Sequence, residues 1–142
     1  MATVNVRELL SRPSNTVERP PVLPAGHFEG SVLRFEFGKS GQKKTPQVTF
    51  FFSVSGATSD VDEEDVVGIN FQRVELRQVF YLTDKALYRL VDFLDAVQGE
   101  STENIDDRIN ELPGTAVIIG VRQRLNDDGE ATGNDVTTVT MG

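Results

Sequence analysis

The sequence predicts an all-β fold with one main helix. Five segments alternate apolar and polar residues with the two-residue period of strands that bury one face. One further segment, residues 83–97, repeats its apolar residues every three or four positions, as an amphipathic helix does. Because the period changes abruptly at Thr83, we expect a strand to lead directly into this helix. One helix beside five strands indicates a small β core that the helix covers at one end.

The first strand is expected over residues 26–37. Its apolar residues change parity near Val32 and Leu33. An extra residue in one strand, a β-bulge, shifts the alternation in this way and bends the strand. Gly30 would ease such a bend. The pattern therefore predicts a long, bent first strand.

A lysine-rich loop, residues 38–46, separates this strand from a second strand at residues 47–54. The loop holds two glycines, one proline and three lysines, a composition typical of turns. In the second strand four apolar residues share one parity, and Phe51 has the other. We expect the two strands to form a hairpin across a basic loop.

An acidic connection, residues 55–68, precedes a third strand at residues 71–82. Four even-numbered residues of this strand are apolar, and Arg73, Glu75 and Arg77 between them are charged, so the even-numbered side is expected to face the core. Thr83 is placed to cap the helix that follows, and Gly99 is suited to end it.

The remainder predicts a short helix and a second hairpin. Residues 103–112 could form the helix, and residues 115–125 alternate as a fourth strand. Residues 126–135 read as a long hairpin loop before a last strand at residues 136–141.

At 142 residues the chain fits one domain, which we place at residues 25–142. Residues 1–24 read as a Pro-rich N-terminal arm, because their four prolines favour extended chain over a long helix. Such an arm is either a partly ordered tail or a segment that docks on a partner. A homo-oligomer formed through the arm is therefore one expectation.

Five strands with a helix between the third and the fourth match the OB-fold. This fold is a five-stranded Greek-key barrel, and its loops between strands 1 and 2 and between strands 4 and 5 flank a nucleic-acid groove. The bent first strand, the basic first loop and the long last loop all occur where that fold has them. Barrels of the SH3 type usually lack this helix.

Three stretches resemble a known family. They are LPAGHFEGSVLRFEFGKSGQKKTPQVTFFFSV, QVFYLTDKALYRLVDFLDAV and LPGTAVIIGV, which together span roughly residues 22–125. They are similar to phage-encoded small OB-fold proteins regarded as single-stranded DNA-binding proteins. The resemblance implies single-stranded DNA as the partner and a role in phage DNA replication or recombination. The ending TTVTMG differs from the acidic tail by which many bacterial-type relatives recruit partners, so recruitment by that route is not expected.

Charge is segregated along the chain. The formal net charge of -8, taken alone, argues against a polyanionic partner. However, residues 60–65, 100–111 and 126–135 hold 14 of the 22 acidic residues. Residues 30–49 and 70–82 are instead rich in lysine and arginine, so a local basic surface is expected.

Binding of single strands requires cations for the backbone and aromatic rings for the bases. Parity places one set of cations and two aromatic rings outside the predicted strands, and the loop lysines could reach the same surface. The alternatives are that the two rings pack under the helix or the arm, and that the cations are only solvated. Five phenylalanines are assigned to the core instead: Phe35, Phe37, Phe50, Phe52 and Phe80. The candidate contacts are Arg34, Lys39, Lys43, Lys44, Phe51, Arg73, Arg77, Tyr81, Arg122 and Arg124.

Enzymatic function is not expected. His27 is the only histidine and cysteine is absent, which disfavours catalytic dyads and metal sites built from these residues. No phosphate-binding GxxxxGK[ST] motif occurs, and the acidic stretches read as solvated loops. The sequence therefore predicts no catalytic residue, no metal and no cofactor. It also shows no membrane-spanning run or secretion signal, so we expect a cytoplasmic protein, in the host cytoplasm if phage-encoded.

Two other functions are compatible with the sequence. One is a non-enzymatic phage interaction or assembly module that does not bind nucleic acid, which the negative net charge favours. The other is an acidic mimic of DNA, which would need the acidic stretches to lie on one face.

Overall fold

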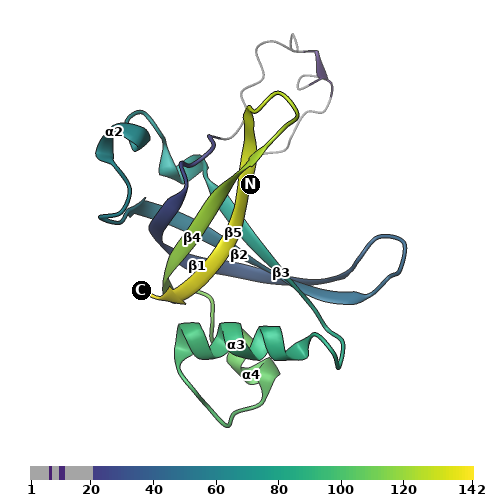
Figure 1. Ribbon diagram of the computed structural model, residues 1–142. Coiled ribbons are helices and arrows are strands. Elements are labelled where there is room, and N and C mark those ends of the chain that lie inside the picture. Colours follow the sequence, from purple (N-terminus) through teal and green to yellow (C-terminus); the bar gives the residue numbers. More distant parts are fainter. Residues whose placement is uncertain (1–6, 8–9, 12–20) are drawn as a thin grey trace.

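Five strands, each antiparallel to its neighbours, form one sheet (Figure 1). The structure is a computed structural model that describes residues 7, 10, 11 and 21–142. The prediction of an all-β fold with few helices is confirmed. The strands in chain order are β1 (Gly26–Lys39), β2 (Pro46–Ala57), β3 (Glu75–Tyr81), β4 (Ala116–Leu125) and β5 (Ala131–Met141).

The sheet curls on itself without closing. Its strand order is β3-β2-β1-β4-β5, so β1 lies in the centre and β3 and β5 are the edges. The curl brings Cα atoms of the two edge strands within 8 Å of each other, although no ladder pairs them. The inner face of the curled sheet therefore encloses the core.

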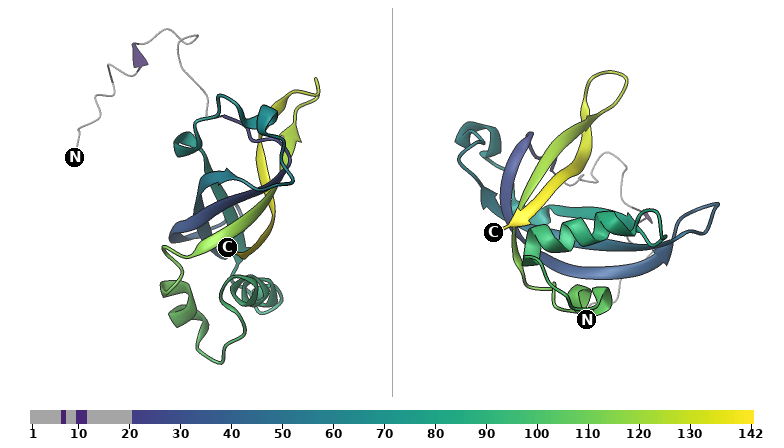
Figure 2. Two further views of the ribbon diagram at one scale, coloured as in Figure 1. Left: turned by 90° about the vertical axis from the view of Figure 1, so that its left-hand side faces the viewer. Right: turned by 60° about the horizontal axis from the view of Figure 1, so that its bottom comes forward.

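Four short helices complete the described part of the chain. The largest, α3, follows β3 and precedes β4 in the chain, and it lies across one end of the curled sheet with α4 beside it (Figure 2). Helix α3 contacts both edge strands, β3 and β5, so it covers the place where they approach. The helices are α2 (Glu63–Val66), the 3₁₀ helix η2 (Phe71–Arg73), α3 (Leu87–Gln98) and α4 (Ile105–Asn110).

Helix α3 begins four residues later than its sequence pattern predicts. Thr83 Oγ1 accepts a hydrogen bond from the Ala86 amide at 3.2 Å, so Thr83 organises a turn that leads into the helix. Gly99 ends the helix as expected, because its positive φ of 87° is a conformation that glycine adopts without strain.

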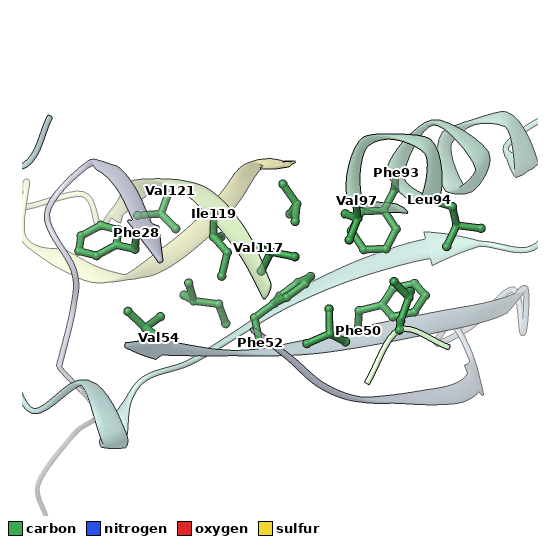
Figure 3. Packing of buried hydrophobic residues seen from close by; sticks show 14 of the residues in the cluster. Phe28, Phe50, Phe52, Val54, Phe93, Leu94, Val97, Val117, Ile119 and Val121 are labelled. Carbon is green, nitrogen blue, oxygen red and sulfur yellow. The ribbon is translucent and has the colours of Figure 1, made fainter. Parts of the chain in front are cut away.

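Aromatic rings from the sheet and from α3 form the centre of the core (Figure 3). The Phe93 ring on α3 lies 4.9 Å, between centroids, from both Phe50 on β2 and Phe80 on β3. Phe50 and Phe52 are fully buried. Burial of such rings is a main source of stability in a domain of this size, so α3 is part of the core rather than an accessory.

The predicted bulge in β1 is confirmed. The pairing of β1 with β2 shifts register between Val32 and Arg34, and again between Glu29 and Gly30. These irregularities bend β1, so its first half pairs with β4 while the whole strand pairs with β2.

Two predicted strand boundaries are wrong. Residues 71–73 form the 3₁₀ helix η2 rather than the start of β3, because the Asn70 side chain accepts a hydrogen bond from the Gln72 amide at 3.1 Å and starts a turn. Strand β5 begins at Ala131 rather than at Val136, so the expected long loop is a short turn at the tip of a two-stranded ribbon.

Most of the expected N-terminal arm lies outside the described residues. Of its described part, Leu23 is fully buried, so the folded body begins before residue 25.

Arg108 is a buried cation that the sequence pattern does not reveal. Only 3% of this side chain is exposed, and its guanidinium donates to Asp95, to Gln98 and to the Gly99 carbonyl at 2.9, 3.2 and 2.8 Å. These bonds satisfy the buried charge and fasten α4 to the end of α3.

Replacement of Gly30 should destabilise the fold because β1 and β2 approach closely there. A Cβ atom at Gly30 would overlap the backbone carbonyl oxygen of Ser53, and backbone cannot move aside cheaply. We expect Gly30→Ala to lower the free energy of unfolding by about 2 kcal/mol or more. Gly38→Ala, in the same strand but with no atom within 4 Å of the new Cβ, should change it by less than about 0.5 kcal/mol. Urea titration of both variants measures the difference, and equal stabilities would contradict this account.

Candidate nucleic-acid interface

Three of the predicted contact residues form one row across the outer face of the sheet. Arg34 on β1 pairs with Phe51 on β2, and Phe51 pairs with Arg77 on β3. Directly paired residues of antiparallel strands point to the same side, so these side chains stand next to one another. The bulge at Leu33 produces this row, because it shifts Arg34 into register with Phe51.

Arg34 contacts the Phe51 ring within this row and the carboxylates of Glu75 and Glu36 beside it. Its guanidinium carbon lies 4.0 Å from the centroid of the Phe51 ring, a cation–π contact. Its two terminal nitrogens donate to the two carboxylate oxygens of Glu75 at 3.2 and 3.3 Å. The hydrogen bonds to Glu75 raise the pKa of Arg34, with a further contribution from Glu36, whose carboxylate lies 3.5 Å away.

A groove of about 300 Å³ lies beside the row. Phe51 and Arg77 form part of its wall on the sheet, and Arg124 contributes from β4 across the groove. The β4–β5 ribbon, which extends from one end of the sheet, supplies this opposite side (Figure 1). The lining residues are Pro21, Val22, Phe51, Val74, Glu75, Leu76, Arg77, Arg124, Thr132, Gly133 and Asn134.

The segment before β1 is fixed as part of the groove wall. Asn134 on β5 accepts from the Leu23 amide at 2.8 Å and donates to the Leu23 carbonyl at 2.9 Å. Gln123 on β4 donates to the same carbonyl at 3.2 Å. These bonds, with the burial of Leu23, hold Pro21 and Val22 against the ribbon.

The predicted cations differ in whether carboxylates neutralise them. Arg122 and Arg124 share Asp135, at 3.6 and 3.5 Å, through their Nε atoms. Among the described residues, no ion pair engages Arg77, Lys39 at the end of β1, or Lys43 and Lys44 in the β1–β2 turn. Within that part of the chain, these four predicted contact residues therefore keep their charge available for a phosphate.

The other predicted residues lie outside the groove lining. Tyr81, with 46% of its surface exposed, is four residues beyond Arg77 on the same face of β3. Lys43 and Lys44 are exposed in the turn between β1 and β2. The prediction that Arg73 points out from a strand is wrong, because Arg73 lies in η2, although it is exposed.

Sequence reasoning misassigned one aromatic residue and missed half of the groove. Phe37 was expected in the core, but 62% of it is exposed, because this half of β1 pairs with β2 on one side and, in the described part of the chain, has no strand on the other. Its ring contacts only the edge of the Phe35 ring among the described aromatic side chains. The missed lining residues on the ribbon are Thr132, Gly133 and Asn134, which are small or polar. Only an asparagine within a threonine-rich strand could have drawn attention to them.

The only histidine stabilises the fold. His27 Nδ1 lies 2.7 Å from a carboxylate oxygen of Asp60, and Thr58 donates to the other oxygen of the same carboxylate. The hydrogen bonds from Thr58 and from His27 lower the pKa of Asp60 from 3.8 to about 2. The cluster ties the β2–β3 connection to the start of β1. Within the described residues, no three histidine, aspartate or glutamate side chains gather as metal ligands would.

No protein-family model matches this sequence, and a search of curated proteins finds no match. In the described part of the chain, no helix has the length and apolar character needed to cross a membrane.

The lowered pKa of Asp60 predicts a defined loss of stability in acid. A carboxyl whose pKa is lower in the folded state than in the unfolded state stabilises the fold above its unfolded pKa, near 3.8. That contribution disappears as the pH falls from about 4 to about 2. Asp60→Asn should therefore be less stable than wild type at pH 7, and the difference should shrink toward pH 2.

Thermal unfolding of both proteins across this pH range measures that difference. Asp62→Asn is a suitable control because the Asp62 side chain does not cap the helix that follows it, and it should cost less stability at pH 7. A wild-type advantage over Asp60→Asn that persists unchanged at pH 2 would contradict the assignment.

Proposed function

We propose that residues 25–142 form an OB-fold, a five-stranded Greek-key barrel with the main helix between strands 3 and 4. Several features support this class. The bent β1 pairs with both β2 and β4, the edges β3 and β5 approach each other, and α3 lies where they do. The groove lies on β2 and β3 and is flanked by the β4–β5 hairpin, which is where proteins of this class bind oligonucleotides.

We infer further that this is a single-stranded DNA-binding protein that acts without sequence specificity and without catalysis. The observation that carries the proposal is the row Arg34, Phe51 and Arg77 beside the groove. An aromatic ring can stack on any base, and a cation beside it can neutralise the adjoining phosphate. Arg77 is the cation of the row that no ion pair engages among the described residues.

The polar groups of the groove explain the absence of sequence preference. The Glu75 carboxylate is occupied by Arg34, and the Asn134 amide is occupied by backbone groups of Leu23 and Arg122. These side chains have little capacity left to read the edges of bases. Contacts therefore come from stacking and from charge, which every base and phosphate offers equally.

Two of the three acidic stretches lie far apart, and the third forms the tip of the β4–β5 ribbon. Helix α2, with Glu63, Glu64 and Asp65, and helix α4, with Asp106 and Asp107, lie at opposite ends of the molecule (Figures 1 and 2). An acidic mimic of DNA would need these charges on one face. The arrangement therefore disfavours the mimic.

The biological setting rests on the sequence resemblance. A phage protein of this kind would act in DNA replication or recombination in the host cytoplasm. Contact between copies through the N-terminal arm is part of the same proposal.

One observation favours a second candidate, a phage interaction or assembly module that binds no nucleic acid. Three of the predicted cations, Arg34, Arg122 and Arg124, are paired with carboxylates. Sedimentation of the chain with and without residues 1–20 tests this candidate, because this truncation keeps the buried Leu23 and its hydrogen bonds. A stable oligomer that is lost on truncation, together with no DNA binding, would support it.

Wild-type protein should bind a fluorescently labelled single-stranded oligonucleotide, with affinity that falls steeply as salt rises. Replacement of Phe51 by alanine should weaken binding by about 1–2 kcal/mol, because one base loses its stacking surface. Tyr88→Ala is the matched control, since Tyr88 is an exposed aromatic on α3, outside the groove. Fluorescence anisotropy measures all three affinities, and absence of wild-type binding even at low salt would overturn the proposal.

Replacement of both Lys43 and Lys44 by alanine should weaken binding and flatten its dependence on salt. Two lost phosphate contacts on a single strand should reduce the slope of log K against log salt by about 1.4. Lys43→Arg with Lys44→Arg keeps both charges and should keep the slope. Titrations at several salt concentrations give the slopes, and an unchanged slope in the alanine variant would remove the turn from the binding surface.

A further inference from the structure

We propose that Arg34 is a positioning residue, which holds the Phe51 ring for base stacking and does not itself bind a phosphate. This inference rests on the proposed function and assigns Arg34 a different role from that of Arg77. It also departs from the sequence-based expectation, in which all cations of the surface contact the DNA backbone.

The charge of Arg34 is already neutralised by carboxylates. Both carboxylate oxygens of Glu75 accept from its terminal nitrogens, and Glu36 lies 3.5 Å from its Nε atom. A phosphate approaching this guanidinium would meet two carboxylates. Arg77, two residues beyond Glu75 on β3, has no such partner among the described residues.

The position of Arg34 relative to the ring separates its role from that of Arg77. The Arg34 guanidinium lies 4.0 Å from the centroid of the Phe51 ring, and it reaches from β1 across β2 to Glu75 on β3. Phe51, Glu75 and Arg77 line the groove, whereas Arg34 does not. Arg34 therefore occupies one face of the ring, and a base entering from the groove would stack on the other face.

Glu75 orients the Arg34 guanidinium and is itself neutralised by it. Its hydrogen bonds fix the plane of the guanidinium, which in turn fixes the ring against which it lies. Its own negative charge, which lies in the groove wall, is offset by Arg34. The three side chains thus act as one unit, in which Arg34 joins Glu75 to Phe51.

Replacing Arg34 by lysine distinguishes a positioning role from a phosphate contact. A lysine carries the same charge and can serve a phosphate as a point charge, but it lacks the planar group that stacks on a ring and bonds a carboxylate through two nitrogens. If Arg34 positions Phe51, then Arg34→Lys should weaken binding even though it keeps the charge that offsets Glu75. If Arg34 binds phosphate, then Arg34→Lys should behave as wild type.

The experiment measures binding of the full chain to a labelled oligo-dT at several salt concentrations. We expect Arg34→Lys to weaken binding about threefold with the salt slope unchanged, because a cation–π contact at an exposed site is of this strength. Arg34→Ala should weaken binding at least as much, because it also leaves the Glu75 carboxylate unpaired in the groove wall. Arg77→Ala should reduce the slope by about 0.7, and Arg77→Lys should keep both slope and affinity. In a Phe51→Ala background, Arg34→Lys should have no further effect, because the two side chains act together.

The ring also gives a readout without DNA. Arg34→Lys should shift the NMR signals of the Phe51 ring protons in the free protein, whereas Arg77→Lys should leave them nearly unchanged. Thermal unfolding verifies that each variant is folded.

Three results would overturn the inference. The first is that Arg34→Lys binds with wild-type affinity while Arg34→Ala binds more weakly and with a reduced salt slope. That result is expected if Arg34 contacts a phosphate. The second is an additive loss in the Phe51→Ala background. The third is unchanged Phe51 ring signals in Arg34→Lys. Failure of the wild-type protein to bind the oligonucleotide would instead overturn the proposed function, and with it this role.

Discussion

The bend in β1 is the constraint on which the rest of the structure depends. One strand must pair with β2 along its length and with β4 over its first half, and a straight strand in a tightly curled sheet cannot do both. The bend occurs where β1 and β2 lie so close that residue 30 has room only for glycine. The curl that results brings the edge strands together and creates the open end that α3 fills with Phe93.

The candidate interface is a product of the same bend. Without the register shift at Leu33, Arg34 would not stand opposite Phe51, and the row that ends at Arg77 would not exist. The groove beside the row needs a second wall, which the β4–β5 ribbon and the segment at Leu23 supply through hydrogen bonds to Asn134. Strand register and one asparagine thus place the proposed binding elements together.

Local pairing of charges reduces the basic surface that the sequence predicts. Arg34, Arg122 and Arg124 are neutralised by nearby carboxylates, whereas in the described part of the chain no ion pair engages Arg77, Lys39, Lys43 or Lys44. Because the acidic helices α2 and α4 are at opposite ends, their repulsion of a polyanion is spread over the surface and is screened by salt. Charge balance along the sequence is therefore a weaker guide to a binding surface than the pairing of individual side chains.

The sequence by itself determined the five strands, the main helix, the bulge in β1 and the outward direction of Phe51 and Arg77, because alternation and helical periodicity are local properties of the chain. The tertiary structure alone decided which side chains meet. The turn at Asn70 shortened β3, the extension of β1 beyond its pairing with β4 exposed Phe37, and the folding of α4 onto α3 buried Arg108. It also decided that Arg34 faces Glu75, since that contact joins residues 41 positions apart through strand register, which no local pattern encodes.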